Sequence, residues 1–263
     1  RMKPAPFDYL RAMSAQDALD ALAEYGEDAR VLAGGQSLMA VLNMRLAQPK
    51  VLIDISRTAE LEAVRVDKQA GHLVVSAAAT QGSVEWRSTL TDEAPLLAMA
   101  FPHISHFQIR NRGTVCGSIA HADPSAELPL VLSALGGDVM LRSRKRRRTL
   151  AAQDFFQGML MTAREPDELV EAVRFPLRRP GERYAFTEFS ARHGDFAIVA
   201  CAAVVTDESI RIAVGGVADR PVTEQWPRLQ GDDLRGALND LSWKLNAQDD
   251  AHAPRVALVS EAT

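Results

Sequence analysis

Hydrophobic positions in the first 30 residues follow a helical spacing. Apolar residues recur at i, i+3 and i+4 over Ala15–Tyr25, which predicts a helix. Ser14 and Asp17 approximate a capping box at its start. Gly26 follows the helix at the position where a terminating glycine is expected.

A strand–loop–helix–strand pattern follows. The apolar run 31–33 predicts a short buried strand that leads directly into Gly34 and Gly35. A second helix is predicted over 37–46, with Pro49 after it, and a strand over 51–55. The N-terminal part therefore reads as a small α/β unit whose glycine pair lies at the strand-to-helix junction.

After residue 60 the pattern changes to strands joined by helices and turns. The predicted elements are a hairpin (62–66 and 72–77), helices (83–90 and 95–101), a glycine-bearing loop (110–129), a helix (130–135), a second hairpin (138–142 and 147–150), a loop or short helix (152–161) and a strand (169–175).

The C-terminal part is predicted to form a separate sheet. Residues 177–183 are rich in Arg, Pro and Gly and mark a candidate boundary. Three antiparallel strands (185–190, 197–206 and 209–217) and a helix near 232–245 are expected beyond it. The fold class is α+β, with a small N-terminal α/β unit, a larger middle α+β unit, and a C-terminal antiparallel sheet with helices. The three predicted units are residues 1–58, 59–176 and 177–263.

Composition excludes several classes of protein. The 263 residues are 47% hydrophobic and 24% charged, with a net charge of −4, so there is no electrostatic footprint for nucleic acid. No window approaches the roughly 18 apolar residues of a membrane span. Cys116 and Cys201 are the two cysteines. An all-thiolate iron–sulfur cluster takes about four, so this chain cannot hold one alone. With no disulfide framework, we expect a cytoplasmic protein.

The glycine pair is the first candidate site. Glycines permit close backbone approach, and N–H groups freed at a helix start bind anions, a diphosphate above all. The alternative is a plain tight turn, and this segment alone does not decide between the two. It matches neither a Walker loop nor the G-x-G-x-x-G fingerprint. The candidate residues are Val31, Leu32, Ala33, Gly34, Gly35, Gln36, Ser37 and Leu38.

The predicted loop over 110–129 is the second candidate, because long connections in compact proteins are usually functional. Thr114 and Ser118 offer hydroxyl donors for a phosphate or a polar ring edge. Asp123 or Glu127 offers a carboxylate that accepts hydrogen bonds from sugar or ribityl hydroxyls.

Together these segments resemble the FAD-binding (medium) subunit of molybdenum-containing hydroxylases, the family of the carbon monoxide dehydrogenase medium subunit and the xanthine dehydrogenase FAD domain. The resemblance covers nearly the whole chain. The segments that carry it are Phe7–Tyr9, Leu32–Leu38, Leu42–Leu46, Leu52–Ile55, Arg110–Pro129, Asp154–Phe156, Gly158, Asp167–Leu169 and Gly194–Phe196.

The resemblance implies FAD held between the N-terminal and middle units. Residues 32–38 would surround the diphosphate with backbone N–H groups, and Glu127 stands where the family often has an Asp that reaches FAD. Asp195 and Phe196 match a loop of the family that comes near the isoalloxazine, so they would lie near the flavin ring. Cys116 replaces the first glycine of the family's usual pair, and it would be strained there if the position required a positive φ. The further residues expected at the cofactor are Ile104, Thr114, Val115, Cys116, Gly117, Ser118, Asp123 and Phe196.

The resemblance also implies that the cofactors of the enzyme are distributed over several subunits. A small subunit would carry two [2Fe–2S] clusters and a large subunit the molybdopterin cofactor, in a dimer of heterotrimers. Electrons would pass from the clusters through this FAD to an external acceptor. We expect no residue of this chain to act as general acid or base, and no metal site.

Two other functions stay open. One is a self-contained flavin oxidase or reductase of the related fold, although only some 85 residues follow position 177, which is small for a substrate-capping domain. The other is a scaffold subunit without cofactor, which only Cys116 favours.

Several remaining features have simpler interpretations. His103 and His106 lack partners at metal-ligand spacing. The basic run 142–148 is expected to be a solvated hairpin tip or a contact to a partner subunit. Cys201 is expected to be buried, and the three tryptophans, at positions 86, 226 and 243, are expected to pack. The chain ends soon after 255–258, which is short for this family.

Overall fold

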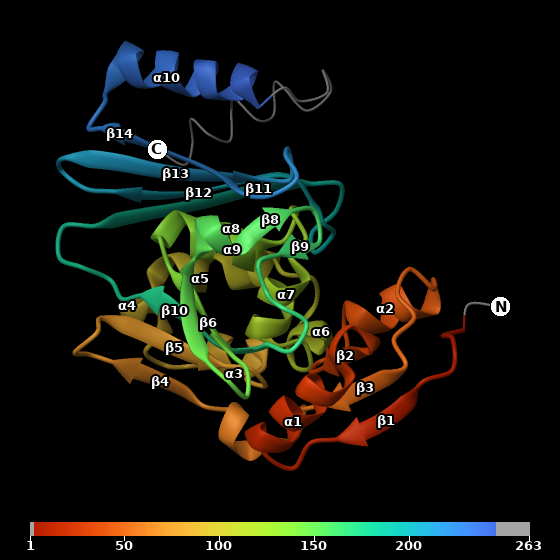
Figure 1. Cartoon of the computed structure of the whole chain (residues 1–263). Coiled ribbons are helices and arrows are strands. Elements are labelled where there is room, and N and C mark those ends of the chain that lie inside the picture. The colour runs from red at the N-terminus through yellow and green to blue at the C-terminus, as the bar shows by residue number, and fades with distance from the viewer. Residues whose placement is uncertain (1–2, 246–263) are drawn as a thin grey trace.

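The computed structural model describes residues 3–245 of the chain; the segment 255–258 lies outside them. The N-terminal unit is a parallel sheet in the order β1-β3-β2 with α1 packed against it (Figure 1). The capping box at Ser14 is present, and Gly26 ends α1 at φ 50°. Both sequence signals therefore fix α1 as predicted. The elements are β1 (Asp8–Arg11), α1 (Ala15–Tyr25), β2 (Ala29–Leu32), α2 (Leu38–Asn43) and β3 (Val51–Asp54).

The middle unit is a five-stranded antiparallel sheet in the order β4-β5-β10-β6-β7, covered on one face by helices. Both predicted hairpins are present. The strands are β4 (Val64–Asp67), β5 (His72–Ser76), β6 (Asp138–Arg142), β7 (Arg147–Ala151) and β10 (Leu169–Pro176), with a small pair β8 (Phe156–Gly158) and β9 (Met161–Thr162). The helices are α3 (Gln81–Glu85), α4 (Leu90–Glu93), α5 (Pro95–Ala100), α6 (Phe107–Arg110), α7 (Val115–His121), α8 (Glu127–Leu135) and α9 (Ala152–Phe155).

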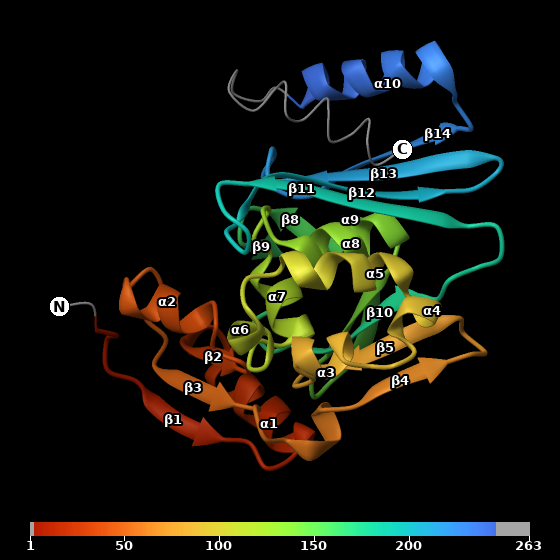
Figure 2. The same ribbon diagram turned by 180° about the vertical axis from the view of Figure 1, so that it is seen from behind.

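A four-stranded antiparallel sheet lies on the other side of these helices (Figure 2). It consists of β11 (Arg183–Ser190), β12 (Ala197–Val205), β13 (Ser209–Gly215) and β14 (Val222–Pro227), with α10 (Gly231–Lys244) on its outer face. β12 is apolar on both faces for this reason: Ala200 and Ala202 face the middle unit, whereas Val199 and Cys201 face α10. Helices thus lie between two sheets, which confirms the predicted mixed α+β class.

The structure corrects part of the sequence interpretation. Residues 110–129 are not a continuous loop, because α7 occupies the middle of the segment and α8 begins at Glu127. Thr114 starts α7 by accepting a hydrogen bond from the backbone N–H of Gly117 at 3.0 Å, so this glycine lies inside a helix. The short strand β1 and the edge strand β14 were missed.

The other corrections concern helix lengths and surface residues. α2 ends at Asn43, and Arg45 then takes a positive φ of 58°. Trp86 and Trp243 are 71% and 66% exposed, so the expectation that they pack in the interior is wrong, whereas Trp226 packs against the core under α10. The basic run lies around the exposed turn between β6 and β7, in agreement with the expected solvated hairpin tip. Its arginines also pair with acids of this chain: Arg146 and Arg148 with Glu168, Arg142 and Arg147 with Glu171, and Arg144 with Asp20.

Candidate flavin site

The glycine loop of the N-terminal unit lies directly against the middle unit. A Cβ added to Gly34 would overlap the carbonyl oxygen of Arg112 and lie 2.6 Å from the Cα of Gly113. Gly35 takes a φ of 72°, which side chains other than glycine rarely adopt. Gly34 is therefore needed because the backbone of the middle unit lies so close, and Gly35 because the turn requires a positive φ.

The same contact brings both predicted segments together. The Cγ atom of Gln36 would lie 3.5 Å from a Cβ on Gly113, the residue that precedes Thr114. The N–H of Gln81 donates to the carbonyl of Gly113 at 2.7 Å, and Thr80 forms a β-bridge with Thr114. The first turn of α7 is thereby held next to the glycine loop.

Only some of the polar groups at this junction form hydrogen bonds within the chain. The side-chain amide of Gln36 donates to the carbonyl of Gly34 at 2.9 Å, which closes the loop. Ser37 precedes α2 but its hydroxyl does not cap it. The hydroxyl oxygen of Thr114 accepts from Gly117, so its own hydrogen remains a donor. Gly117 and Ser118 are partly exposed at this edge of α7.

Val115 and Cys116 point into the interior instead. They are 0% and 2% exposed, so only their backbone can reach a ligand. Cys116 has helical backbone without a positive φ, and its thiol donates to the carbonyl of Val75 at 3.3 Å. Burial raises the pKa of the thiol, which keeps it neutral. The replacement of glycine by cysteine therefore introduces no backbone strain.

Carboxyl groups follow α7. Asp123 accepts from the backbone N–H of Ser125 at 2.9 Å, in the turn that leads to α8. Glu127, the first residue of α8, is 7% exposed. Burial, opposed by a backbone hydrogen bond, raises the pKa of Glu127 to about 7. Burial, together with the negative charge of Glu127, raises the pKa of Glu188 on β11 to about 8.

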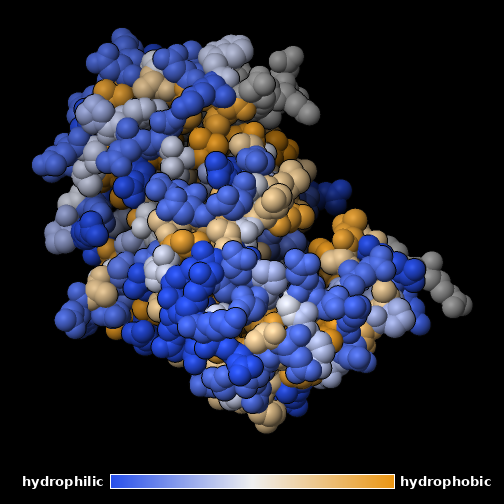
Figure 3. Space-filling view, in the orientation of Figure 1, coloured by the Kyte–Doolittle hydropathy of each residue, from blue (hydrophilic) through white to orange (hydrophobic). Residues whose placement is uncertain are grey.

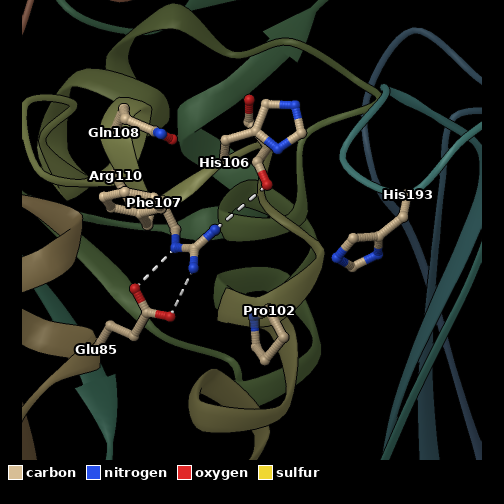
Figure 4. Close-up of a pocket in the computed structure, with 8 residues that line it drawn as sticks. Glu85, Pro102, His106, Phe107, Gln108, Arg110 and His193 are labelled. Carbon is tan, nitrogen blue, oxygen red and sulfur yellow. Dashed lines mark hydrogen bonds and ion pairs between the residues drawn. The ribbon is translucent and has the colours of Figure 1, made fainter.

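The segment before α6 and the loop after β11 meet at the edge of the site. The carbonyl of Ile104 accepts from Arg110 at 2.7 Å, and Arg110 forms an ion pair with Glu85 at 2.7 Å (Figure 4). Gly194 lies against the carbonyl of Ser105. The loop that carries Phe196 therefore rests beside Ile104, and the ring of Phe196 is 71% exposed.

The shallow pocket drawn in Figure 4 opens beside this contact. It is lined by His106 and Phe107 from one side and by His193 from the other. His103 packs on Phe186 with ring centroids 5.0 Å apart. Among residues 3–245 no three His, Cys, Asp or Glu side chains are grouped to hold a metal ion.

The surface between the units is hollowed (Figure 3). Exposed apolar side chains follow α2, at Met44 and Leu46, and lie at 159–161, in the turn between β8 and β9 and at the first residue of β9. In the part of the chain that the structure describes, no helix is long and apolar enough to cross a membrane.

Comparison with known proteins identifies the family. Residues 5–178 match the family model described as "FAD binding domain in molybdopterin dehydrogenase". The chain belongs to this family. It is thus an FAD-binding oxidoreductase subunit of the molybdenum hydroxylase type, as the resemblance predicted.

Relatives of similar length support this assignment. The chain is 37% identical to the caffeine dehydrogenase subunit beta of Pseudomonas sp. (strain CBB1), over 89% of this chain and 82% of that protein. It is 38% identical to the nicotine 6-hydroxylase medium subunit of Paenarthrobacter nicotinovorans, over 83% of this chain and 77% of that one. The structure of carbon monoxide dehydrogenase from Hydrogenophaga pseudoflava superposes with a TM-score of 0.90 at 30% identity, covering 98% of this chain and 96% of that one.

The sequence patterns did not indicate that the polar side chains of Glu188 and Gln81 face the interior. Gln81 is 6% exposed, and its side-chain carbonyl has no hydrogen-bond partner among the described residues. Glu188 alternates with Tyr184 and Phe186, which pack against the core of the middle unit. The period of a strand therefore carries a signal that this carboxyl faces inward. No pattern around Gln81 distinguishes it from a surface residue.

Proposed function

We propose that this chain holds one FAD at the junction of the N-terminal and middle units and transfers electrons through it. The close approach of Gly34 to Gly113 carries the proposal, because it aligns the backbone of the glycine loop with the first turn of α7. A loop with two glycines leaves room for a diphosphate against its N–H groups. The donors and acceptors present at the junction fit this group.

Each proposed contact follows from exposure and chemistry. The backbone of 31–38 would hold the diphosphate, with Gln36 and Ser37 as side-chain donors. Thr114, Gly117 and Ser118 would contact the cofactor along the edge of α7, and Val115 and Cys116 only through their backbone. Asp123 and Glu127 would accept from hydroxyl groups. Ile104 and Phe196 would supply apolar contacts. FAD supplies the redox chemistry when bound, and these side chains position it.

Partner subunits complete the proposed path. Relatives of this chain carry names such as "medium chain" and "subunit beta". Its two cysteines are too few for an iron–sulfur cluster. We propose a small subunit with two [2Fe–2S] clusters and a large subunit with molybdopterin, assembled as a dimer of heterotrimers in the cytoplasm. Units 1–58 and 59–176 would together hold the cofactor. Unit 177–263 would cover the cofactor site from the C-terminal side.

The test is purification of the native complex through a tag on this chain, followed by metal and flavin analysis. Iron, molybdenum and FAD in one particle are expected. A complex that assembles without flavin would overturn the proposal in favour of a scaffold. Reduction of bound flavin by a small substrate in the isolated chain would overturn it in favour of a self-contained oxidase.

A further inference from the structure

A buried arginine joins helix α3 to the turn that precedes α6. Arg110, the last residue of α6, is 8% exposed, and its Nε and Nη2 atoms donate to the two carboxylate oxygens of Glu85 at 2.7 and 2.9 Å (Figure 4). Glu85 is the last residue of α3. The third nitrogen, Nη1, donates to the backbone carbonyls of Ile104 and Ser105 at 2.7 and 3.3 Å. The guanidinium therefore binds an acid and a backbone turn at the same time.

The turn that Arg110 holds has an unfavourable backbone conformation. Ser105 takes a φ of 43°, which residues with a side chain rarely adopt, so its surroundings must hold it there. α6 follows directly, and the N–H groups of Ile109 and Arg110 donate to the carbonyl of His106. Hydrogen bonds from a charged donor are stronger than those from a neutral one, so the guanidinium stabilises the turn in this conformation.

The same turn also contacts the loop between β11 and β12. A Cβ added to Gly194 would lie 3.0 Å from the carbonyl oxygen of Ser105. This carbonyl is thus contacted both by Arg110 and by the loop. Phe196 belongs to the loop, and its ring is 71% exposed. Arg110 therefore acts on Ile104 through a direct hydrogen bond and on the position of Phe196 through the Ser105 carbonyl.

We propose that Arg110 is a positioning residue for the flavin ring: together with Glu85 it fixes Ile104 and the loop of Phe196 at the apolar end of the FAD site. The role toward FAD rests on the proposed function, whereas the attachment of the turn and the loop to Arg110 does not. Lysine cannot replace this arginine, because an ammonium lacks the planar set of donors that reaches a carboxylate and two carbonyls at once. Glu85 is equally required, since it orients the guanidinium and compensates its buried charge.

The contact between the glycine loop and the start of α7 does not depend on this side chain. Gly34 approaches backbone atoms of Arg112 and Gly113. Within the described part of the chain, the hydrogen bonds of the Arg110 side chain go to residues 85, 104 and 105. Arg110→Lys also keeps the positive charge. The substitution should therefore disturb the flavin end of the site and leave the diphosphate end intact.

The experiment compares Arg110→Lys with the wild type and with Arg174→Lys. The control has the same substitution in another two-bond ion pair, in which Arg174 of β10 donates to Asp138 of β6 at 2.6 and 2.7 Å. The first readout is hydrogen exchange in the chain without FAD, at the N–H groups of Ile109 and Asp195, which are hydrogen-bonded beside the turn and in the loop. We expect exchange about tenfold faster in Arg110→Lys and wild-type rates in Arg174→Lys. Wild-type rates in Arg110→Lys would overturn the attachment.

The second readout is the Kd for FAD and for ADP, which contains the diphosphate but no flavin ring. Arg110→Lys should raise the Kd for FAD about tenfold and change the Kd for ADP less than about twofold, and Arg174→Lys should change neither. Equal rises for both ligands would show a general structural effect and overturn the positioning role, as would an unchanged Kd for FAD. A wild-type chain that binds neither ligand would refute the proposed function instead, while hydrogen exchange still decides whether Arg110 holds the turn and the loop.

A second variant covers the case in which Arg110→Lys does not fold. Gly194→Ala places a Cβ 3.0 Å from the Ser105 carbonyl oxygen at a φ of 85°, whereas Gly181→Ala has a similar φ of 82° and its Cβ meets nothing within 4 Å. Gly194→Ala should therefore raise the Kd for FAD and leave the Kd for ADP unchanged, and Gly181→Ala should alter neither. The same effect of both substitutions on the Kd for FAD would overturn the role of the contact between turn and loop.

Discussion

Substitution of Gly34 by alanine tests the contact that joins the two halves of the candidate site. The new Cβ would lie 2.6 Å from the Cα of Gly113 and closer still to the carbonyl oxygen of Arg112, whereas ordinary contacts begin at 3.4 Å. Both neighbours are backbone atoms, which cannot move aside as a flexible side chain can. The glycine loop and the start of α7 would have to separate by about 0.8 Å or more, at a cost of about 1–3 kcal/mol.

This separation would act on cofactor binding as well as on stability. Because each 1.4 kcal/mol is a factor of ten in affinity, Gly34→Ala should raise the Kd for FAD about 5- to 150-fold. Titration of flavin fluorescence against the purified chain measures this Kd, and a thermal melt measures stability. The control is Gly236→Ala in α10, where an added Cβ meets nothing within 4 Å. It should stabilise the chain by about 1 kcal/mol and leave the Kd unchanged. A Gly34→Ala chain with wild-type Kd and melting temperature would refute the reasoning.

Three further substitutions test neighbouring elements. Thr114→Ala removes the cap of α7 and a free hydroxyl, so it should cost about 1 kcal/mol in denaturant unfolding and weaken FAD binding, whereas Thr114→Ser should preserve both; equal losses in the two variants would contradict this. Cys116→Gly should lower the free energy of unfolding by about 2 kcal/mol, because it places a glycine within α7 and leaves a cavity where the buried side chain was. The Kd for FAD should stay unchanged; a large gain in affinity would show instead that the cysteine distorts the site. Burial opposes ionisation of Glu168, but the hydrogen bond from Arg148 holds its pKa below the ordinary value, so the wild type should lose stability as pH falls through that pKa. Glu168→Gln should flatten this acid limb in pH-dependent melts, and an unchanged limb would rule out the buried pair as its source.

Local signals allowed much of the fold to be predicted. Ser14 and Gly26 delimit α1 because capping depends on residues next to one another in sequence. The hairpins and the three strands β11, β12 and β13 follow from alternation and turn residues. The edge strand β14 carries only a weak apolar face, with alternate half-buried and exposed residues, and was missed.

The candidate site was harder to predict from the sequence, because it depends on contacts between segments that lie far apart in the chain. The glycine pair marks a close approach, but nothing local shows that its partner is Arg112 and Gly113. The glycine at 117 suggested a loop, whereas the cap by Thr114 makes the segment helical.

The most direct test of the central claim is the flavin stoichiometry of the purified chain. Equilibrium dialysis against FAD, followed by absorbance of the protein fraction, gives bound flavin per polypeptide. The proposed site predicts one FAD per chain, with the Kd raised in Gly34→Ala and unchanged in Gly236→Ala. A wild-type chain that is folded by circular dichroism and yet takes up no FAD would contradict the account.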